Sequence, residues 1–160
     1  CNGINVADLI NLKFSDIQNG EISFIREKTK DRTRDAKRIY APITPEMQSI
    51  IEKWGNNPRK SIYIFPFMKA GDDAWEHEKK KKNLTKHIND RMKVIGEKLN
   101  IGKITTYVAR HTYATVLRNE GVPVSIISPM LGHTSVTTTE IYLADLESEN
   151  RARNAHLLSF

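Results

Sequence analysis

One continuous segment decides the fold, and it runs from Thr105 to Tyr142. Its sequence is TTYVARHTYATVLRNEGVPVSIISPMLGHTSVTTTEIY (105–142). Gly121 and Pro123 interrupt the helical pattern once, and Gly132 interrupts it again. The sequence therefore predicts three short helices, at 107–119, at 124–131 and around Tyr142.

Three side chains of this segment have chemistry that suits a phosphate. Arg110 carries a planar guanidinium that can donate two parallel hydrogen bonds to phosphate oxygens. His133 can donate a hydrogen bond or transfer a proton, and the Tyr142 hydroxyl can attack phosphorus to form a covalent intermediate. Together they indicate phosphoryl transfer on a nucleic-acid backbone without a metal. Spacing alone does not establish that they converge, since arginines often form salt bridges and tyrosines often only pack.

Composition is compatible with a polyanionic partner. The chain has 160 residues, 25 Lys+Arg against 19 Asp+Glu, and a net charge of +6. Nucleic-acid, ribosomal and membrane-surface proteins share such an excess. The single cysteine, Cys1, excludes an intrachain disulfide and a cysteine-based zinc site. We expect one domain from a cytoplasmic, nucleoid-associated protein with no membrane span.

The first half predicts a small antiparallel sheet. Strands are expected at 21–26 and 39–43, joined by a basic connection between Arg26 and Arg38. This connection is either a solvated loop or an arm that lies against a DNA backbone, and the segment alone favours neither. Further expected elements are helices at 5–12, 45–54 and 76–100 and a short or edge strand within 61–67. The predicted fold is α+β and mainly α-helical.

The motifs together resemble the tyrosine recombinases of the phage integrase type. The matching pieces are ARHTYAT (109–115), MLGHTS (130–135) and TEIY (139–142), preceded by GINVADL (3–9). The order of Arg-His, Leu-Gly-His and Tyr at these spacings is much more specific than any single piece. The resemblance covers nearly the whole chain, 1–160, as a catalytic domain. It implies a fragment that lacks an N-terminal DNA-binding domain and the first helices of the catalytic domain.

The resemblance implies a mechanism for each residue that matches. Tyr142 attacks the phosphodiester and forms a 3′-phosphotyrosyl link, while Arg110 and His133 hold the non-bridging oxygens. Lys28, on the basic connection, protonates the leaving 5′ oxygen. Because the phosphotyrosine conserves the bond energy, the resemblance implies no cofactor and no metal.

Two positions depart from the family pattern. Asn5 stands where the family has an arginine, and Tyr107 stands where it has a histidine. Asp8 matches the aspartate that supports the missing arginine, although Asn5 can also be read simply as a helix N-cap. We hypothesise that an arginine of the basic connection, Arg26 or Arg32, supplies the missing charge. An impaired enzyme is the other explanation.

The expected partner is double-stranded DNA. Candidate DNA-binding residues on the basic connection are Arg26, Lys30, Arg32 and Arg34. The resemblance implies an integrase of a mobile genetic element that acts as a homo-oligomer, a tetrameric synapse, with DNA-bending accessory proteins. The tail after Tyr142 either docks on a neighbouring copy or folds back. Two alternatives stay open: a DNA-binding module with impaired catalysis, and a nicking-closing enzyme like type IB topoisomerases.

Overall fold

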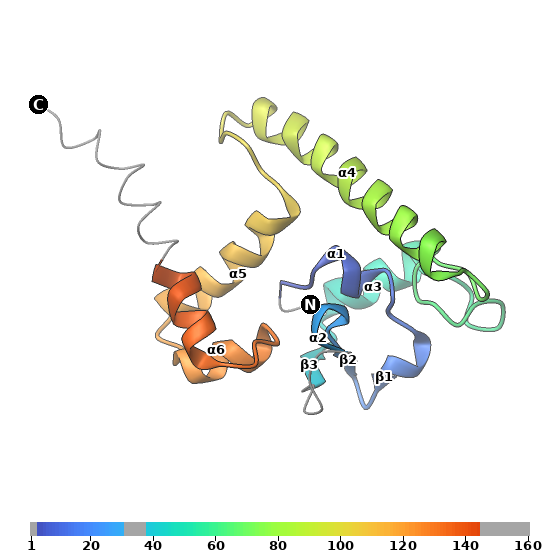
Figure 1. The fold of residues 1–160 in the computed structure, drawn as a ribbon, viewed down its shortest axis with the longest axis horizontal. Helices are drawn as coiled ribbons and strands as arrows, with labels where there is room; N and C mark the ends of the chain where they lie inside the picture. Colours follow the sequence, from blue (N-terminus) through green and yellow to red (C-terminus); the bar gives the residue numbers. More distant parts are fainter. Residues whose placement is uncertain (1–2, 31–37, 145–160) are drawn as a thin grey trace, which may run out of the picture.

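The computed structural model describes residues 3–30 and 38–144, and this part of the chain is mainly helical (Figure 1). The elements in chain order are α1 (Val6–Leu9), the 3-10 helix η1 (Phe14–Asp16), β1 (Ile17–Gln18), β2 (Glu21–Ile25), α2 (Glu27–Lys30), β3 (Arg38–Pro42), α3 (Pro45–Trp54), α4 (Ala74–Lys98), α5 (Thr106–Asn119) and α6 (Val124–Met130). Residues 136–144 are also helical. The predicted fold class, mainly helical with a small antiparallel sheet, is confirmed. Of the helices described, none is both long enough and apolar enough to cross a membrane.

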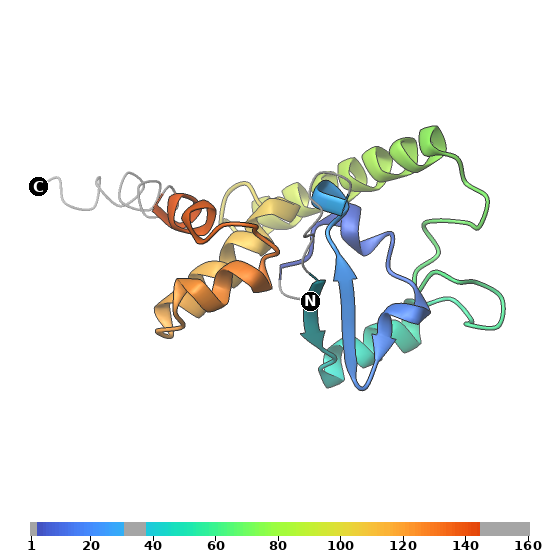
Figure 2. The same ribbon diagram turned by 60° about the horizontal axis from the view of Figure 1, so that its bottom comes forward.

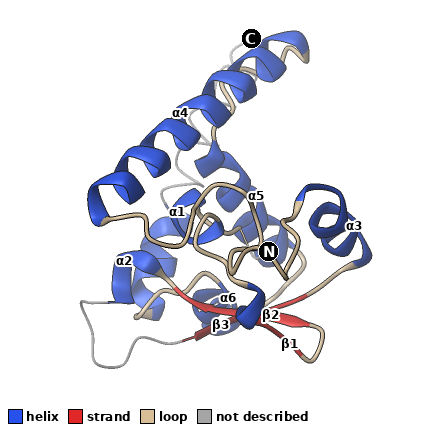
Figure 3. Cartoon of the chain, turned by 90° about the vertical axis from the view of Figure 1, so that its right-hand side faces the viewer, coloured by secondary structure: helices blue, strands red, loops and turns tan. Residues whose placement is uncertain are grey.

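The sheet has three antiparallel strands in the order β1-β2-β3 (Figure 3). Ile22 pairs with Ala41 and Phe24 with Ile39, and all four side chains are buried on one face. This alternation is the period of two that the sequence predicted. The sequence did not predict β1, whose turn to β2 uses Asn19 and Gly20 at positive φ. Within the basic connection the structure places α2, which the sequence also did not predict.

Three hydrophobic clusters hold the elements together. The first joins the sheet to α3 and includes Leu12, Phe24 and Ile64. The second joins α1 to α4, and the third joins α5, α6 and helix 136–144. In Figure 1, α5 and α6 lie on the left and the sheet and α3 lie lower on the right, with α4 above. Figure 2 shows β2 and β3 running side by side with α3 at their end.

Several large apolar side chains on the helices are exposed. Trp54 is 62% exposed and Leu99 62%, and Ile50, Ile95 and Ile126 are also exposed. Each belongs to a surface helix that buries only a narrow stripe, so an apolar pattern all along the helix overestimates its buried face. The predicted helix at 5–12 is shorter, ending at Leu9.

The expected strand within 61–67 is wrong. Only an isolated bridge between Tyr63 and Lys13 forms there. The backbone of the segment bonds mainly to the backbone around Lys13, where the Ile64 N–H donates to the Leu12 carbonyl (2.9 Å). The Asn56 side-chain amide adds a bond to the Tyr63 carbonyl (3.0 Å). These few bonds satisfy the backbone of the segment without extending the bridge into a regular strand.

The C-terminal helices meet the N-terminal sheet at Gly132. This residue has φ +65°, and a Cβ added to it would lie 2.4 Å from Arg26 Cδ and 2.5 Å from Ile39 Cδ1. Only glycine allows both the backbone conformation and the close approach. Helix α6 also contacts β3 (Figure 3). The loop that carries His133 therefore packs against the sheet, next to Arg26 at the end of β2.

Candidate active site

One open cavity of about 500 Å³ gathers most of the predicted site residues. Its lining residues come from the start of α1, the β2–α2 junction, α5 and the segment after α6: Asn5, Arg26, Lys28, Thr29, Tyr107, Arg110, Gly132, His133, Thr134, Thr138 and Tyr142. The cavity therefore lies where the two ends of the described chain meet.

Arg110 is fixed at the back of this cavity by backbone carbonyls. It is 5% exposed, its Nη1 donates to the Gly3 carbonyl (3.1 Å), and its Nη2 donates to the Leu131 carbonyl. Burial, and then the nearby Arg26 guanidinium, lower the pKa of Arg110 to about 10. The group is still a cation at neutral pH, held in one orientation with N–H donors to spare.

His133 is held on both sides of its ring. Its Nε2 lies 3.4 Å from Arg110 Nη2, and its Nδ1 lies 2.8 Å from the Thr139 hydroxyl. Burial lowers the pKa of His133 to about 4, with further lowering by Arg110, Arg26 and Lys28. The imidazole is therefore neutral at pH 7.

Tyr142 points its ring into an aromatic cluster beside His133. The ring stacks on His111 with centroids 4.6 Å apart, and it meets the rings of His133 and Tyr107 edge-on at 5.9 Å and 6.1 Å. Its hydroxyl is buried and has no hydrogen-bond partner within residues 3–30 and 38–144. Burial raises the pKa of Tyr142 to about 12, with Tyr107 raising and Arg110 lowering it.

Arg26 places a second guanidinium in the cavity. Its Nη1 donates to the Gly132 carbonyl (3.3 Å), and its Nε lies 3.9 Å from Asp8 Oδ2. Asp8 is 5% exposed and accepts a hydrogen bond from the Glu27 backbone N–H (2.8 Å). Burial raises the pKa of Asp8, while that N–H and Arg26 lower it. Asp8 thus supports an arginine, and that arginine is Arg26.

The remaining predicted residues divide into three groups. Lys28, Tyr107 and Asn5 line the same cavity, with Asn5 at the N-cap position of α1 but without a side-chain capping bond. Lys30 lines a different cavity, together with Asp8. Arg32 and Arg34 lie outside the described residues, as does the tail from 145 onward, so their expected roles stay predictions.

The cavity is strongly positive. Arg26, Arg110 and Lys28 line it, and the Asp8 carboxylate lies behind Arg26. Burial, and then repulsion between the cations, lower the pKa of Arg110 and of His133, and an anion with several oxygens would relieve the repulsion. No cluster of three or more His, Cys, Asp or Glu side chains gathers as metal ligands in the described ranges. The arrangement suits a phosphodiester rather than a cation.

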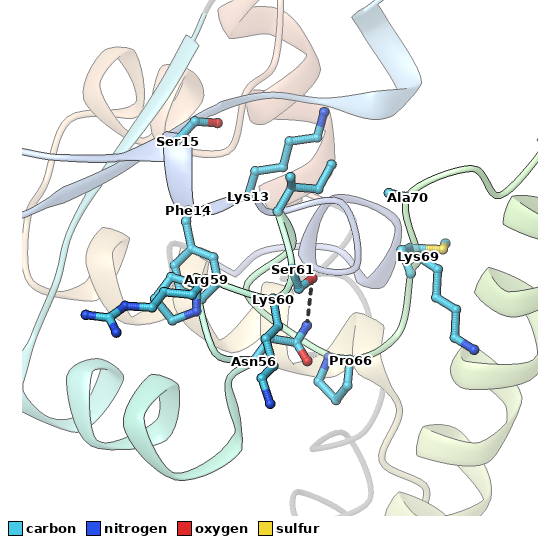
Figure 4. A pocket seen from close by; sticks show the side chains of 13 residues that line it. Lys13, Phe14, Ser15, Asn56, Arg59, Lys60, Ser61, Pro66, Lys69 and Ala70 are labelled. Atoms are coloured by element: carbon cyan, nitrogen blue, oxygen red, sulfur yellow. Dashed lines mark hydrogen bonds between the residues drawn. The ribbon is translucent and has the colours of Figure 1, made fainter.

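A larger cavity of about 710 Å³ near the loop at 56–70 is a weaker candidate. It is also lined by cations, but Figure 4 shows the charged ends of Lys13, Arg59 and Lys69 pointing in different directions. No nucleophile with an activating partner lies among its lining residues.

Sequence reasoning missed two residues around Tyr142. Thr139 contacts His133, and its position three residues before Tyr142 on one helix could have suggested a shared face. The other is His111, whose position next to Arg110 in the sequence places it on a different face of the helix and so gave no sign of a role in the site. It is half-buried and stacks on Tyr142, a contact that depends on how helix 136–144 docks on α5.

Known proteins share both the sequence pattern and the fold. Residues 2–149 match the model of the Phage integrase family. The chain is 32% identical over 145 residues to tyrosine recombinase XerA of Pyrococcus furiosus, and 30% identical over 141 residues to XerA of Pyrococcus horikoshii. Each alignment covers 88% of this chain and 45% of the relative, so the chain spans less than half the length of these relatives.

A solved structure, described as the crystal structure of XerA recombinase, has the same fold. It superposes with a TM-score of 0.60 at 24% identity, covering 99% of this chain and 55% of that one. Since the family model matches nearly all of the residues, the resemblance seen in the motifs is confirmed, and the chain belongs to the phage integrase family.

Proposed function

We propose that this chain cleaves and rejoins DNA strands through a 3′-phosphotyrosyl intermediate and acts as a site-specific recombinase. The observation that carries the proposal is the cavity itself, where Tyr142 lies with two guanidiniums, Lys28 and a neutral imidazole. Family membership supports the same reaction.

The proposed step transfers a phosphoryl group without net hydrolysis. The Tyr142 oxygen attacks phosphorus and loses its proton to the neutral His133 ring, while the bond from phosphorus to the 5′ oxygen breaks. Lys28 donates a proton to that leaving oxygen, which becomes a 5′-hydroxyl. Attack by a 5′-hydroxyl reverses the step and restores the phosphodiester. Arg110 stabilises the charge that develops on the non-bridging oxygens, a role that a fixed, buried donor performs well.

Arg26 completes the phosphate pocket in this proposal. The family pattern expects an arginine at Asn5, whose amide cannot supply a guanidinium. Arg26 contacts Asp8 and Gly132 and lines the cavity with Arg110, which supports the hypothesis that it provides the second fork. An enzyme without the usual arginine can thus keep two guanidiniums facing one phosphate.

The proposed substrate is double-stranded DNA, held by the positive surface around the cavity. Exchange of both strands between two duplexes requires one nucleophile for each strand, so we propose a tetramer assembled on two duplexes. DNA-bending accessory proteins and a role in moving a mobile element belong to the same proposal.

The test is capture of the covalent intermediate. The protein is incubated with a pool of duplexes that carry a nick and a randomised core, and SDS-resistant protein–DNA adducts are isolated and sequenced. The wild type should form adducts enriched in one sequence, and Tyr142→Phe should form none while still shifting DNA in a gel. Binding without adducts in the wild type would instead support a DNA-binding module, and adducts without sequence enrichment a nicking-closing enzyme.

A further inference from the structure

The ring of His133 has two polar neighbours that differ in chemistry. Arg110 Nη2 lies 3.4 Å from Nε2, and the Thr139 hydroxyl lies 2.8 Å from Nδ1. A guanidinium only donates, whereas a hydroxyl both donates and accepts. The two contacts are therefore compatible with only one arrangement of protons on the neutral ring.

That arrangement puts the proton on Nδ1. If Arg110 donates to Nε2, then Nε2 has a lone pair, and the single N–H of the neutral imidazole is at Nδ1. The Nδ1–H then donates to the Thr139 oxygen. Arg110, which can only donate, thus selects the tautomer with the proton on Nδ1, and the Thr139 oxygen stabilises it by accepting that N–H.

Thr139 is well placed to enforce this state. It is 0% exposed, and it lies three residues before Tyr142 on the same helix. Its hydroxyl also suits the reaction after proton transfer, because the imidazolium keeps the same Nδ1–H and the same acceptor. One buried side chain thus links the helix of the nucleophile to the ring that faces it.

We propose that Thr139 is a positioning residue that stabilises His133 with its proton on Nδ1. Nε2 then carries the lone pair, which becomes the acceptor of the Tyr142 proton once a bound phosphate takes over the Arg110 donor. This deepens, and rests on, the proposed strand cleavage. The Tyr142 O–H bond breaks as the oxygen attacks phosphorus, the proton goes to Nε2, and the cation that forms is stabilised by its hydrogen bond to Thr139. In this proposal His133 first accepts a proton, whereas the resemblance implies that it donates a hydrogen bond to a non-bridging oxygen.

The first measurement is the tautomer of His133 in the free protein. Long-range ¹H–¹⁵N NMR distinguishes a protonated ring nitrogen from a bare one, and His133→Gln identifies the resonance. At neutral pH the wild type should show Nδ1 protonated and Nε2 bare. A wild-type ring protonated on Nε2 overturns the proposal whatever any variant does.

The second measurement compares three threonine variants in the adduct assay. Thr139→Val keeps the shape and removes the hydroxyl, so we expect cleavage about 10- to 100-fold slower, with DNA binding unchanged and the proton of His133 shifted toward Nε2. Thr139→Ser restores a hydroxyl and should recover most of the rate and the Nδ1 signal. Thr137→Val, an exposed position on the same helix, is the matched control and should behave as the wild type.

The outcomes separate the two proposals. No adduct with the wild-type protein refutes strand cleavage itself. Wild-type adducts together with an unchanged rate and tautomer in Thr139→Val refute only the role of Thr139. A slower Thr139→Val that Thr139→Ser does not rescue indicates packing rather than the hydroxyl, and it also counts against the proposal.

Discussion

At the scale of single residues, the charge of the pocket depends on where Arg26 lies. It follows β2 directly, and its side chain turns toward Asp8 and the Gly132 carbonyl rather than into solvent. Asp8 explains this choice, because a buried carboxylate needs a cation nearby. An arginine at the end of a strand has thereby become a candidate ligand for phosphate.

Replacing Arg26 should therefore impair cleavage. We expect Arg26→Ala to slow adduct formation by about 100- to 1,000-fold, the range found for loss of one fixed donor to a developing oxyanion. Arg26→Lys should recover part of the rate, since an ammonium keeps the charge but not the fork. The measurement is the rate of adduct formation at saturating protein.

The matched control is Arg38→Ala. Arg38 is exposed at the start of β3 and donates to Ser23, away from the cavity. It should change the cleavage rate by only a few-fold. Equal losses in both variants would mean that general electrostatic attraction, and not the pocket, explains Arg26.

The lowered pKa of His133 makes a prediction about acid stability. The unfolded chain binds a proton at this side chain near pH 6.5, but the folded chain does so only near pH 4. Folding stability should fall as the pH is lowered through this window, by up to about 3 kcal/mol from this one group. His133→Asn should flatten that decline in urea unfolding between pH 7 and 4.5.

His87→Asn serves as the comparison, because His87 is exposed on α4. The stability of this variant should depend on pH in the same way as that of the wild type. If the stability of His133→Asn falls with decreasing pH as steeply as that of the wild type, then the buried site does not disfavour the protonated His133 ring.

At the scale of elements, the long helix α4 depends on its first turn. Asp73 accepts a hydrogen bond from the Glu76 backbone N–H (2.8 Å), and the Glu76 side chain accepts one from the Asp73 N–H (3.3 Å). This capping box satisfies two backbone donors that the helix leaves unpaired. The rest of α4 is highly charged and buries few side chains. The capping box therefore contributes a large share of what stabilises the helix.

Asp73→Ala should destabilise the protein by about 1 kcal/mol, seen as a lower urea midpoint at unchanged slope. Asp90→Ala, in the exposed middle of α4, should be neutral or slightly stabilising because alanine favours helix. A similar loss in both variants would contradict a specific role for the cap.

The elements also show how far sequence reasoning reaches. Helices α3 and α5 were predicted to within a residue because a Thr-Pro start and a Gly121 stop are local signals. The prediction at 61–67 was wrong, since its apolar and aromatic residues fit a strand but the segment forms only one isolated bridge, to Lys13, and a side-chain bond from Asn56. Contacts of that kind are not encoded in local periodicity.

At the scale of the whole molecule, the site combines residues from one local segment with an arginine from a distant part of the chain. Arg110, His133 and Tyr142 were predicted because one segment carries all three. Arg26 was only one of two candidates, since nothing in its neighbourhood indicates which way the side chain turns. Thr139 was missed because its partner lies across a turn of the chain, and its hydrogen bond needs the packed helix to exist.

The hydrogen bonds that close the pocket have a consequence for the order of folding. Arg26 contacts Gly132 across 106 positions, and Arg110 contacts Gly3 across 107. Such distant contacts form only after most of a chain has been ordered, because the loop between them must first close. A chain emerging from the ribosome exposes Tyr142 after the segments that it must meet. An incomplete chain therefore has no assembled pocket.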